Sequence, residues 1–166
     1  LAHHFREAQT AVGIEKLVHY SLLAGDRALA SYGYEDALDY SERGLVARDI
    51  DLSGPEPAND EEAAALLFGL ARAKSATGVG HQLSEAFSAL SRAFEYYAES
   101  GSVAQAVAAA EFPINSPAYR IPVVAEEIAR ALALVPADSH EAGDSSLDMV
   151  ESLGLLKLTM TVLNKH

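Results

Sequence analysis

No stretch of the chain alternates apolar and polar residues over six or more positions, the pattern of a half-buried strand. The six prolines fall in three segments, at 55–57, 113–122 and 136, and a proline inside a helix removes a hydrogen bond and clashes with the preceding turn. The intervals between them are rich in Ala, Leu, Glu and Arg, which favour helices. We therefore predict an all-α fold, with helices over residues 2–9, 13–31, 35–48, 59–77, 82–100, 102–111, 121–134 and 139–163.

Several of these helices have recognisable ends. Asn59 or Asp60 precedes two glutamates and an Ala/Leu run, which places a side-chain acceptor and negative charge at the positive end of a helix. We expect Ser84 and Asp138 to cap helices in the same way. Gly78 and Gly101 follow helical runs and are suited to a left-handed helix stop.

A degraded period of about 34 residues links these helices, as in a tetratricopeptide repeat. Ala24-Gly25 and Phe68-Gly69 stand where that pattern has Leu-Gly, and small residues follow at its second-helix positions, namely Ala37 and Gly44 in one unit and Ala86 and Ala93 in the next. Ser41 stands where a large residue is expected. The predicted units span 13–49, 59–100, 102–136 and, in part, 139–166. They form one domain over 1–166, stacked as a right-handed superhelix, and a plain helical bundle is the alternative.

The segments LAHHFREA, EKLVHYSLLAGDRALASYGYEDALDYSERGL, FEYYAESGSVAQAVAAAEFP and RALALVPADSHEAG together resemble the tetratricopeptide region of bacterial signal-transduction ATPases. Proteins of that class often carry a LuxR-type DNA-binding domain or an adenylate/guanylate cyclase domain. The resemblance covers residues 1–144 and implies a cytoplasmic interaction arm attached to a nucleotide-binding switch. The segment from Ser145 to the end departs from it. Because the chain begins with Leu1 and not Met, we expect it to be a segment of a longer protein.

The net charge and the lack of cysteine exclude or disfavour several classes of binding partner and catalytic site. With 12 Lys and Arg against 24 Asp and Glu the formal charge is −12, which disfavours binding to nucleic acid or to anionic membranes. No apolar run reaches the roughly 18 residues of a membrane span. There is no cysteine, so thiolate metal sites and a cysteine nucleophile are excluded.

No residue pattern indicates catalysis, a metal or a cofactor. His19, His81 and His140 lack the spacing of metal ligands, and Gly78-Val79-Gly80 lacks the rest of a phosphate loop. The carboxylates are interpreted as solvated, with Asp39–Arg43 and Glu126–Arg130 as helix ion pairs, and the cluster Glu56, Asp60, Glu61 and Glu62 as a helix start. We expect the aromatic residues near the helix contacts to pack in the core, with Tyr32 or Tyr97 as the exposed exception. They are Tyr32, Tyr34, Tyr40, Phe87, Phe94, Tyr96 and Tyr97.

The first helix of each unit would line the concave wall of the superhelix. With Gly25 and Gly69 as register marks, the wall residues are His19, Leu22, Asp26, Leu29, Leu66, Leu70 and Lys74. This wall is mainly apolar, so it fits an apolar or helical segment of a partner protein, or another domain of the same polypeptide, better than a peptide carboxylate. We predict a noncatalytic interaction or sensor arm. A small-molecule-binding helical sensor is the alternative, an enzyme is disfavoured, and a homo-oligomer stays open.

Overall fold

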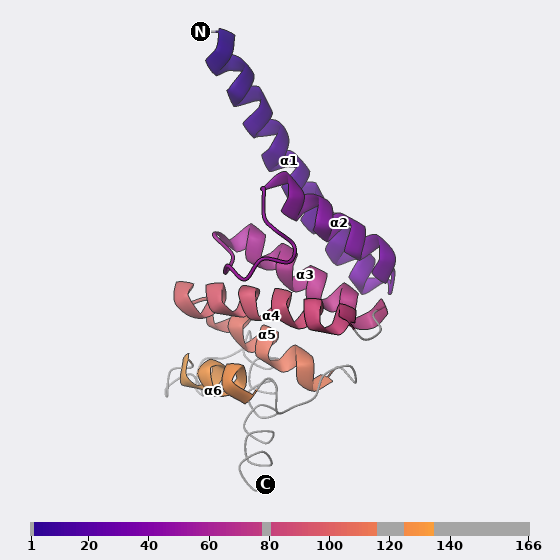
Figure 1. Ribbon diagram of the computed structural model, residues 1–166, viewed down its shortest axis with the longest axis vertical. Coiled ribbons are helices and arrows are strands. Elements are labelled where there is room, and N and C mark those ends of the chain that lie inside the picture. The colour runs from indigo at the N-terminus through magenta and orange to yellow at the C-terminus, as the bar shows by residue number, and fades with distance from the viewer. Residues whose placement is uncertain (1, 78–80, 116–124, 135–166) are drawn as a thin grey trace, which may run out of the picture. The chain divides into compact units, whose positions relative to one another are not determined.

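The computed structural model describes residues 2–77, 81–115 and 125–134, and it is helical throughout these ranges apart from turns and one loop (Figure 1). The helices are α1 (Ala2–Ala30), α2 (Tyr34–Ala47), α3 (Glu61–Thr77), α4 (His81–Ser100), α5 (Val103–Asn115) and α6 (Ala125–Leu134). The described residues include no strand, which confirms the all-α prediction. None of their helices combines the length and apolar character that crossing a bilayer requires.

The chain divides into two compact units, Leu1–Arg92 and Ala93–His166. The boundary falls inside α4, so α4 contributes its first part to one unit and its last part to the other. The predicted fourth repeat unit, 139–166, and Pro136 lie outside the described residues.

In the first unit, α1 packs on α2, α2 packs on α3, and α1 also contacts α3. Val18, Leu45, Leu66, Leu67 and Leu70 are at most 1% exposed and form the centre of its core. Burying a side chain of this kind contributes about 1.5–3 kcal/mol, so these residues dominate the stability of the unit.

Small residues set the close approach of α1, α2 and α3. A Cβ atom built on Gly25 would lie 3.7 Å from the Cβ of Tyr40, and one built on Gly69 would lie 3.1 Å from the Oγ of Ser41. Ser41 is 3% exposed, so the position expected to hold a large residue is a crossing point too narrow for one. Both glycines therefore lie where one helix approaches another.

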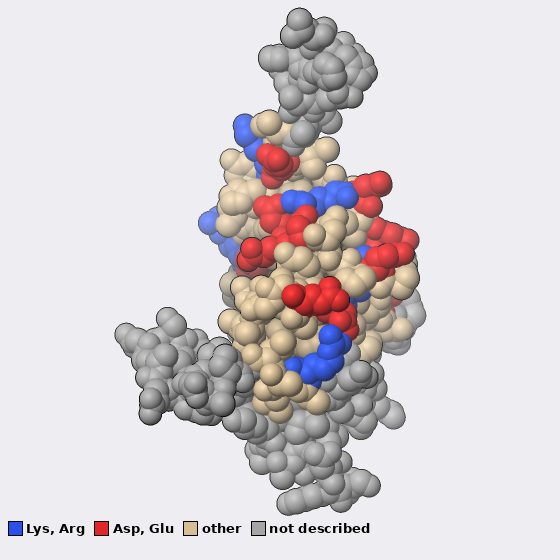
Figure 2. All heavy atoms as spheres, turned by 90° about the vertical axis from the view of Figure 1, so that its left-hand side faces the viewer, with Lys and Arg blue, Asp and Glu red and all other residues tan. Residues whose placement is uncertain are grey.

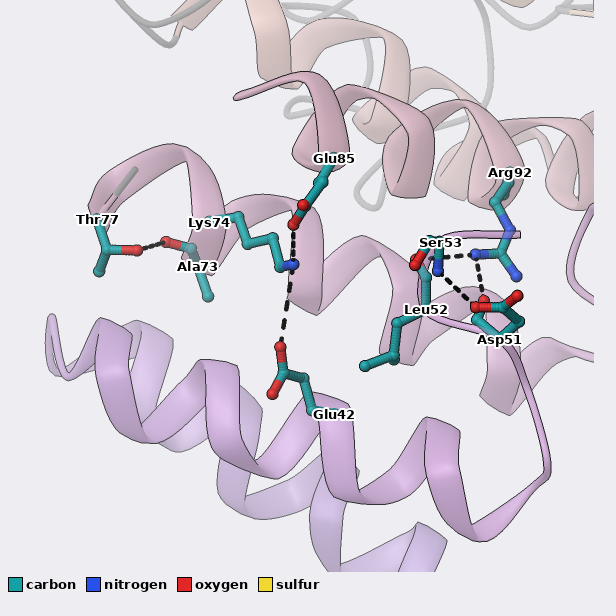
Figure 3. Close-up of polar contacts among 9 residues, drawn as sticks. All are labelled: Glu42, Asp51, Leu52, Ser53, Ala73, Lys74, Thr77, Glu85 and Arg92. Atoms are coloured by element: carbon teal, nitrogen blue, oxygen red, sulfur yellow. Dashed lines mark hydrogen bonds and ion pairs between the residues drawn. The ribbon is translucent and has the colours of Figure 1, made fainter. Parts of the chain in front are cut away.

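Partly exposed ion pairs join the elements of the first unit. Lys74 of α3 lies between Glu42 of α2 and Glu85 of α4, with N–O distances of 3.9 and 2.6 Å (Figure 3). Arg48, at the end of α2, pairs with Asp60 and Glu62 at the start of α3. The acidic cluster at this helix start is thus partly neutralised, whereas the sequence suggested solvated carboxylates.

The loop between α2 and α3 is fastened to α4 by Arg92, which is 4% exposed. Its guanidinium donates hydrogen bonds to the carbonyl oxygens of Asp51 at 2.9 Å and Leu52 at 3.4 Å (Figure 3). It also donates one to the carbonyl oxygen of Glu56 at 2.6 Å. Burial lowers the pKa of Arg92, while the charges of Glu56 and Asp51 act in the opposite direction. An arginine retains its proton in such a setting. Arg92 is therefore a buried cation whose hydrogen bonds hold the loop against α4.

The second unit has its own core, in which Phe94, Tyr97 and Val107 are at most 3% exposed. Arg130 of α6 pairs with Glu95 of α4, with its Nη2 donating to Oε2 at 2.8 Å, and its guanidinium lies 5.2 Å from the centre of the Phe94 ring. The hydrogen bond from Arg130 lowers the pKa of Glu95.

Most helix ends agree with the sequence, and three differ. Asp60 caps α3, accepting the Ala63 N–H at 2.8 Å, and Gly101 ends α4 with a φ of 73°. The helices predicted at 2–9 and 13–31 are one helix, because a single interior glycine, Gly13, costs only about 1 kcal/mol. Ser84 lies inside α4 and does not cap it. α5 continues two residues past Pro113, where only its last turn is affected.

Candidate functional site

A groove runs between α1 and α2 and encloses about 410 Å³. Its lining combines apolar and aromatic side chains, two small residues and two arginines. The lining residues are Leu17, Tyr20, Ser21, Leu23, Ala24, Arg27, Tyr40 and Arg43. We call this feature the α1–α2 groove.

The spacing of residues on the two helices explains the groove. Leu17, Tyr20, Ala24 and Arg27 follow one another at intervals of three and four, so they share one face of α1. Ser21 is 3% exposed and lies against Gly44 of α2, on which a Cβ would be 3.2 Å from the Cβ of Ser21. The close backbones leave no room for large side chains between them, so the large residues of this face project outward.

The apolar side chains of the groove are unusually exposed. Tyr20 is 66% exposed, Leu23 55% and Leu17 46%, and they succeed one another on the same helix. Single exposed apolar residues are common on protein surfaces, whereas a contiguous set is typical of a surface that another molecule covers.

The two arginines at the groove differ in their electrostatic partners. Arg43 forms a two-point ion pair with Asp39, with Nε to Oδ1 at 3.2 Å and Nη2 to Oδ2 at 2.6 Å, which confirms the predicted helix pair. Arg27 is exposed in the last turn of α1 and has no carboxylate partner within the part of the chain that the structure describes. Figure 2 shows that the basic side chains on one face of the molecule mostly lie next to acidic ones.

The residues predicted to line a concave wall do not form one open surface. Leu29, Leu66 and Leu70 are 7%, 1% and 1% exposed and belong to the core. Leu29 packs with Ala residues of α1, α2 and α3, and both Cδ atoms of Leu66 lie at Gly44 of α2. The apolar positions were identified correctly, but neighbouring helices already cover them. A charge placed there would be buried without a partner and would unfold the unit.

The other predicted wall residues are separated by their environments. His19 and Asp26 are exposed, and Leu22 is half-buried. Lys74 is held by Glu42 and Glu85 and is therefore not available to clamp a ligand carboxylate. Sequence reasoning missed Tyr20, Leu23, Arg27 and Arg43. The available signal was that α1 has apolar residues on more than one face, since Leu17 and Tyr20 flank the buried Val18.

A second, more polar hollow lies beside Glu15, Lys16, His19, Tyr20, Arg48 and Glu62. The charge of Arg48 beside this hollow is balanced by ion pairs with Asp60 and Glu62. Across residues 2–77, 81–115 and 125–134, no group of three or more His, Asp or Glu side chains is placed to hold a metal ion.

Comparison of the chain with protein-family models, curated proteins and solved structures finds no match.

Proposed function

We propose that the chain is a noncatalytic helical scaffold, the protein-interaction arm of a signalling or transcription-regulatory protein, and that its α1–α2 groove receives a helix. The helix belongs to a partner protein or to another domain of the same polypeptide. The observation that carries this proposal is the exposed apolar row Leu17, Tyr20 and Leu23 beside the groove. The interaction role predicted from the sequence is retained, and its site is moved from the concave wall to this groove.

The shape of the groove favours a helix over an extended peptide. The groove is lined by residues of two helices, and the small residues Ser21 and Ala24 are among them, so a third helix can lay apolar side chains against it. Covering a half-exposed Leu or Tyr contributes about 1 kcal/mol, so the row supports modest affinity and further contacts must supply the rest.

We also propose that α1–α2 and α3–α4 are successive pairs of a tetratricopeptide-like stack. The proposal is supported by the contacts of α2 and α1 with α3, and by Gly25 and Gly69 at close helix approaches. Binding in the groove would then change how an attached switch domain packs. An experimental structure in which the pairs fail to stack with a right-handed turn would overturn this arrangement.

The proposed docking site is tested by selecting helical peptides on the purified chain and measuring their affinity for two variants. Leu23→Glu places a charge in the apolar row and should abolish binding. Val46→Glu is the matched control, because Val46 is 64% exposed on α2 and does not line the groove. Circular dichroism should show equal helix content in both. Equal loss of binding in both variants, or in neither, would contradict the proposal.

The second candidate function is small-molecule binding, which was the alternative function considered from the sequence. A volume of about 410 Å³ lies within the usual range for small-ligand sites, and Tyr20, Tyr40 and Arg27 would suit an aromatic carboxylate. A thermal-shift screen with aromatic acids, sugars and nucleotides separates the two candidates. Stabilisation that Leu23→Glu removes, without any peptide binding, would favour the small ligand.

A further inference from the structure

We infer that the helix occupying the α1–α2 groove carries a carboxylate that pairs with Arg27, so that Arg27 selects the partner. This inference rests on the proposed function, since it names the chemistry of the molecule that the groove receives. It makes Arg27 a specificity-determining residue and predicts as the ligand an amphipathic helix that carries a carboxylate at one fixed position.

The two arginines at the groove differ in whether a carboxylate balances their charge. Arg43 is neutralised by Asp39, whereas Arg27 has no carboxylate partner among the described residues. The chain as a whole has a formal charge of −12. An uncompensated cation beside the exposed apolar row therefore stands out against an acidic protein, and it complements an acidic group on the molecule that covers the row.

The position of Arg27 in the last turn of α1 gives it one structural role, because a cation there faces the negative end of the helix. That role needs only a solvated guanidinium. A helix laid over Leu17, Tyr20 and Leu23 would remove water from Arg27 as well, and a desolvated cation without an acceptor opposes binding. A partner with a carboxylate at this point is favoured, and one with an apolar or basic residue is rejected.

The geometry of α1 sets the position of the carboxylate. Leu17 and Arg27 are ten residues apart, which corresponds to about 15 Å along a helix. The ligand therefore has apolar anchors at intervals of three or four residues and an Asp or Glu about ten residues from the anchor that meets Leu17. Arginine and a carboxylate can form two parallel hydrogen bonds, which makes this contact directional.

The test is a display library of amphipathic helical peptides selected separately on three forms of the full chain: the unsubstituted chain, Arg27→Glu and Lys16→Glu. Lys16 is the control, an exposed cation on α1 that lines the neighbouring hollow and not the groove. The unsubstituted chain and Lys16→Glu should both select Asp or Glu at one fixed position. Arg27→Glu should select Lys or Arg at that same position.

Affinities of individual peptides then quantify the effect. Exchanging the selected Glu for Lys should weaken binding to the unsubstituted chain on the order of tenfold and strengthen binding to Arg27→Glu by a similar factor. Selected helices that bind Arg27→Glu and the unsubstituted chain equally, yet lose affinity for Leu23→Glu, would overturn the inference and leave the proposed function intact. Helices that bind Leu23→Glu unchanged would overturn both. A dimer of the chain in sedimentation that Leu23→Glu makes monomeric would also overturn the inference, because a second copy would then fill the groove.

Discussion

Replacing Gly44 by alanine tests the close packing of α1, α2 and α3. A Cβ at this position would lie 2.7 Å from both Cδ atoms of Leu66 and 3.2 Å from the Cβ of Ser21. Leu66 is 1% exposed, so its side chain cannot move into solvent to make room. We expect Gly44→Ala to lower the free energy of unfolding.

The magnitude follows from two opposing effects. Alanine is favoured over glycine in a helix interior by about 1 kcal/mol, and overpacking a well-filled core costs roughly 1–3 kcal/mol. The net expectation for Gly44→Ala is a destabilisation of about 1 kcal/mol.

Gly25→Ala is the matched control, because Gly25 also lies inside a helix at the α1–α2 contact. The nearest atoms to its added Cβ would be at 3.7 Å and 3.8 Å, an ordinary contact distance. No overpacking opposes the helix preference here, so this variant should be more stable than the unsubstituted chain by roughly 0.5–1 kcal/mol.

Urea unfolding followed by circular dichroism measures both variants, together with Leu66→Ala and the double variant Gly44→Ala/Leu66→Ala. Removing the Cδ atoms of Leu66 should remove the clash, so Gly44→Ala should become stabilising in that background. The coupling energy of this double-mutant cycle should be about 1–3 kcal/mol. If Gly44→Ala alone stabilises the chain as much as Gly25→Ala does, the account of the α2–α3 contact is wrong.

Three further changes test other parts of the structure. Tyr32 is 79% exposed with a φ of 61°, a conformation costly for any residue with a Cβ, so Tyr32→Gly should raise the free energy of unfolding by roughly 0.5–1 kcal/mol, whereas Tyr32→Ala should not. Arg92→Met should cost about 3 kcal/mol and accelerate amide hydrogen exchange in the 50–59 loop, because its buried carbonyls lose their donor; unchanged exchange would show that the loop holds without it. The hydrogen bond from Arg130 lowers the pKa of Glu95, so the loss of stability in Glu95→Gln should be largest above the ordinary glutamate pKa. This loss should vanish as the pH falls through the lowered pKa. Urea unfolding at several pH values measures it, and a difference that does not change with pH would contradict the expectation.

Local signals in the sequence predicted the helices well. Asp60 caps α3, Gly101 ends α4, and Gly25 lies at a close helix approach, each for a reason that depends only on nearby residues. The break predicted before Gly13 was wrong because one glycine is too weak a signal to end a long helix. The hydrogen bonds of Arg92 join residues 36 or more positions apart, so no local sequence pattern could indicate them.

The site was harder to predict than the fold, because a repeat pattern identifies apolar positions without stating which helix covers them. Leu66 and Leu70 were placed on an open wall, and the structure buries both. Tyr20 and Leu23 were not singled out in the sequence, and the structure leaves both exposed. The difference depends on which face of α1 meets α2. Ser21 lies against Gly44 and is buried, whereas Tyr20 and Leu23 are exposed beside it.

The groove and the core follow from the same packing rule. Close approach at Gly25 and Gly44 buries Ser21 and Ser41, which leaves Leu17, Tyr20 and Leu23 no place between the helices. Substitutions in the core and in the groove should therefore have separate effects, on stability and on peptide binding respectively. Gly44→Ala should reduce the stability of the chain yet leave peptide binding intact wherever the chain is folded, whereas Leu23→Glu should remove binding with little change in stability. A variant at Gly44 that remains folded and fails to bind would show that the groove depends on finer helix positioning than its lining residues alone provide.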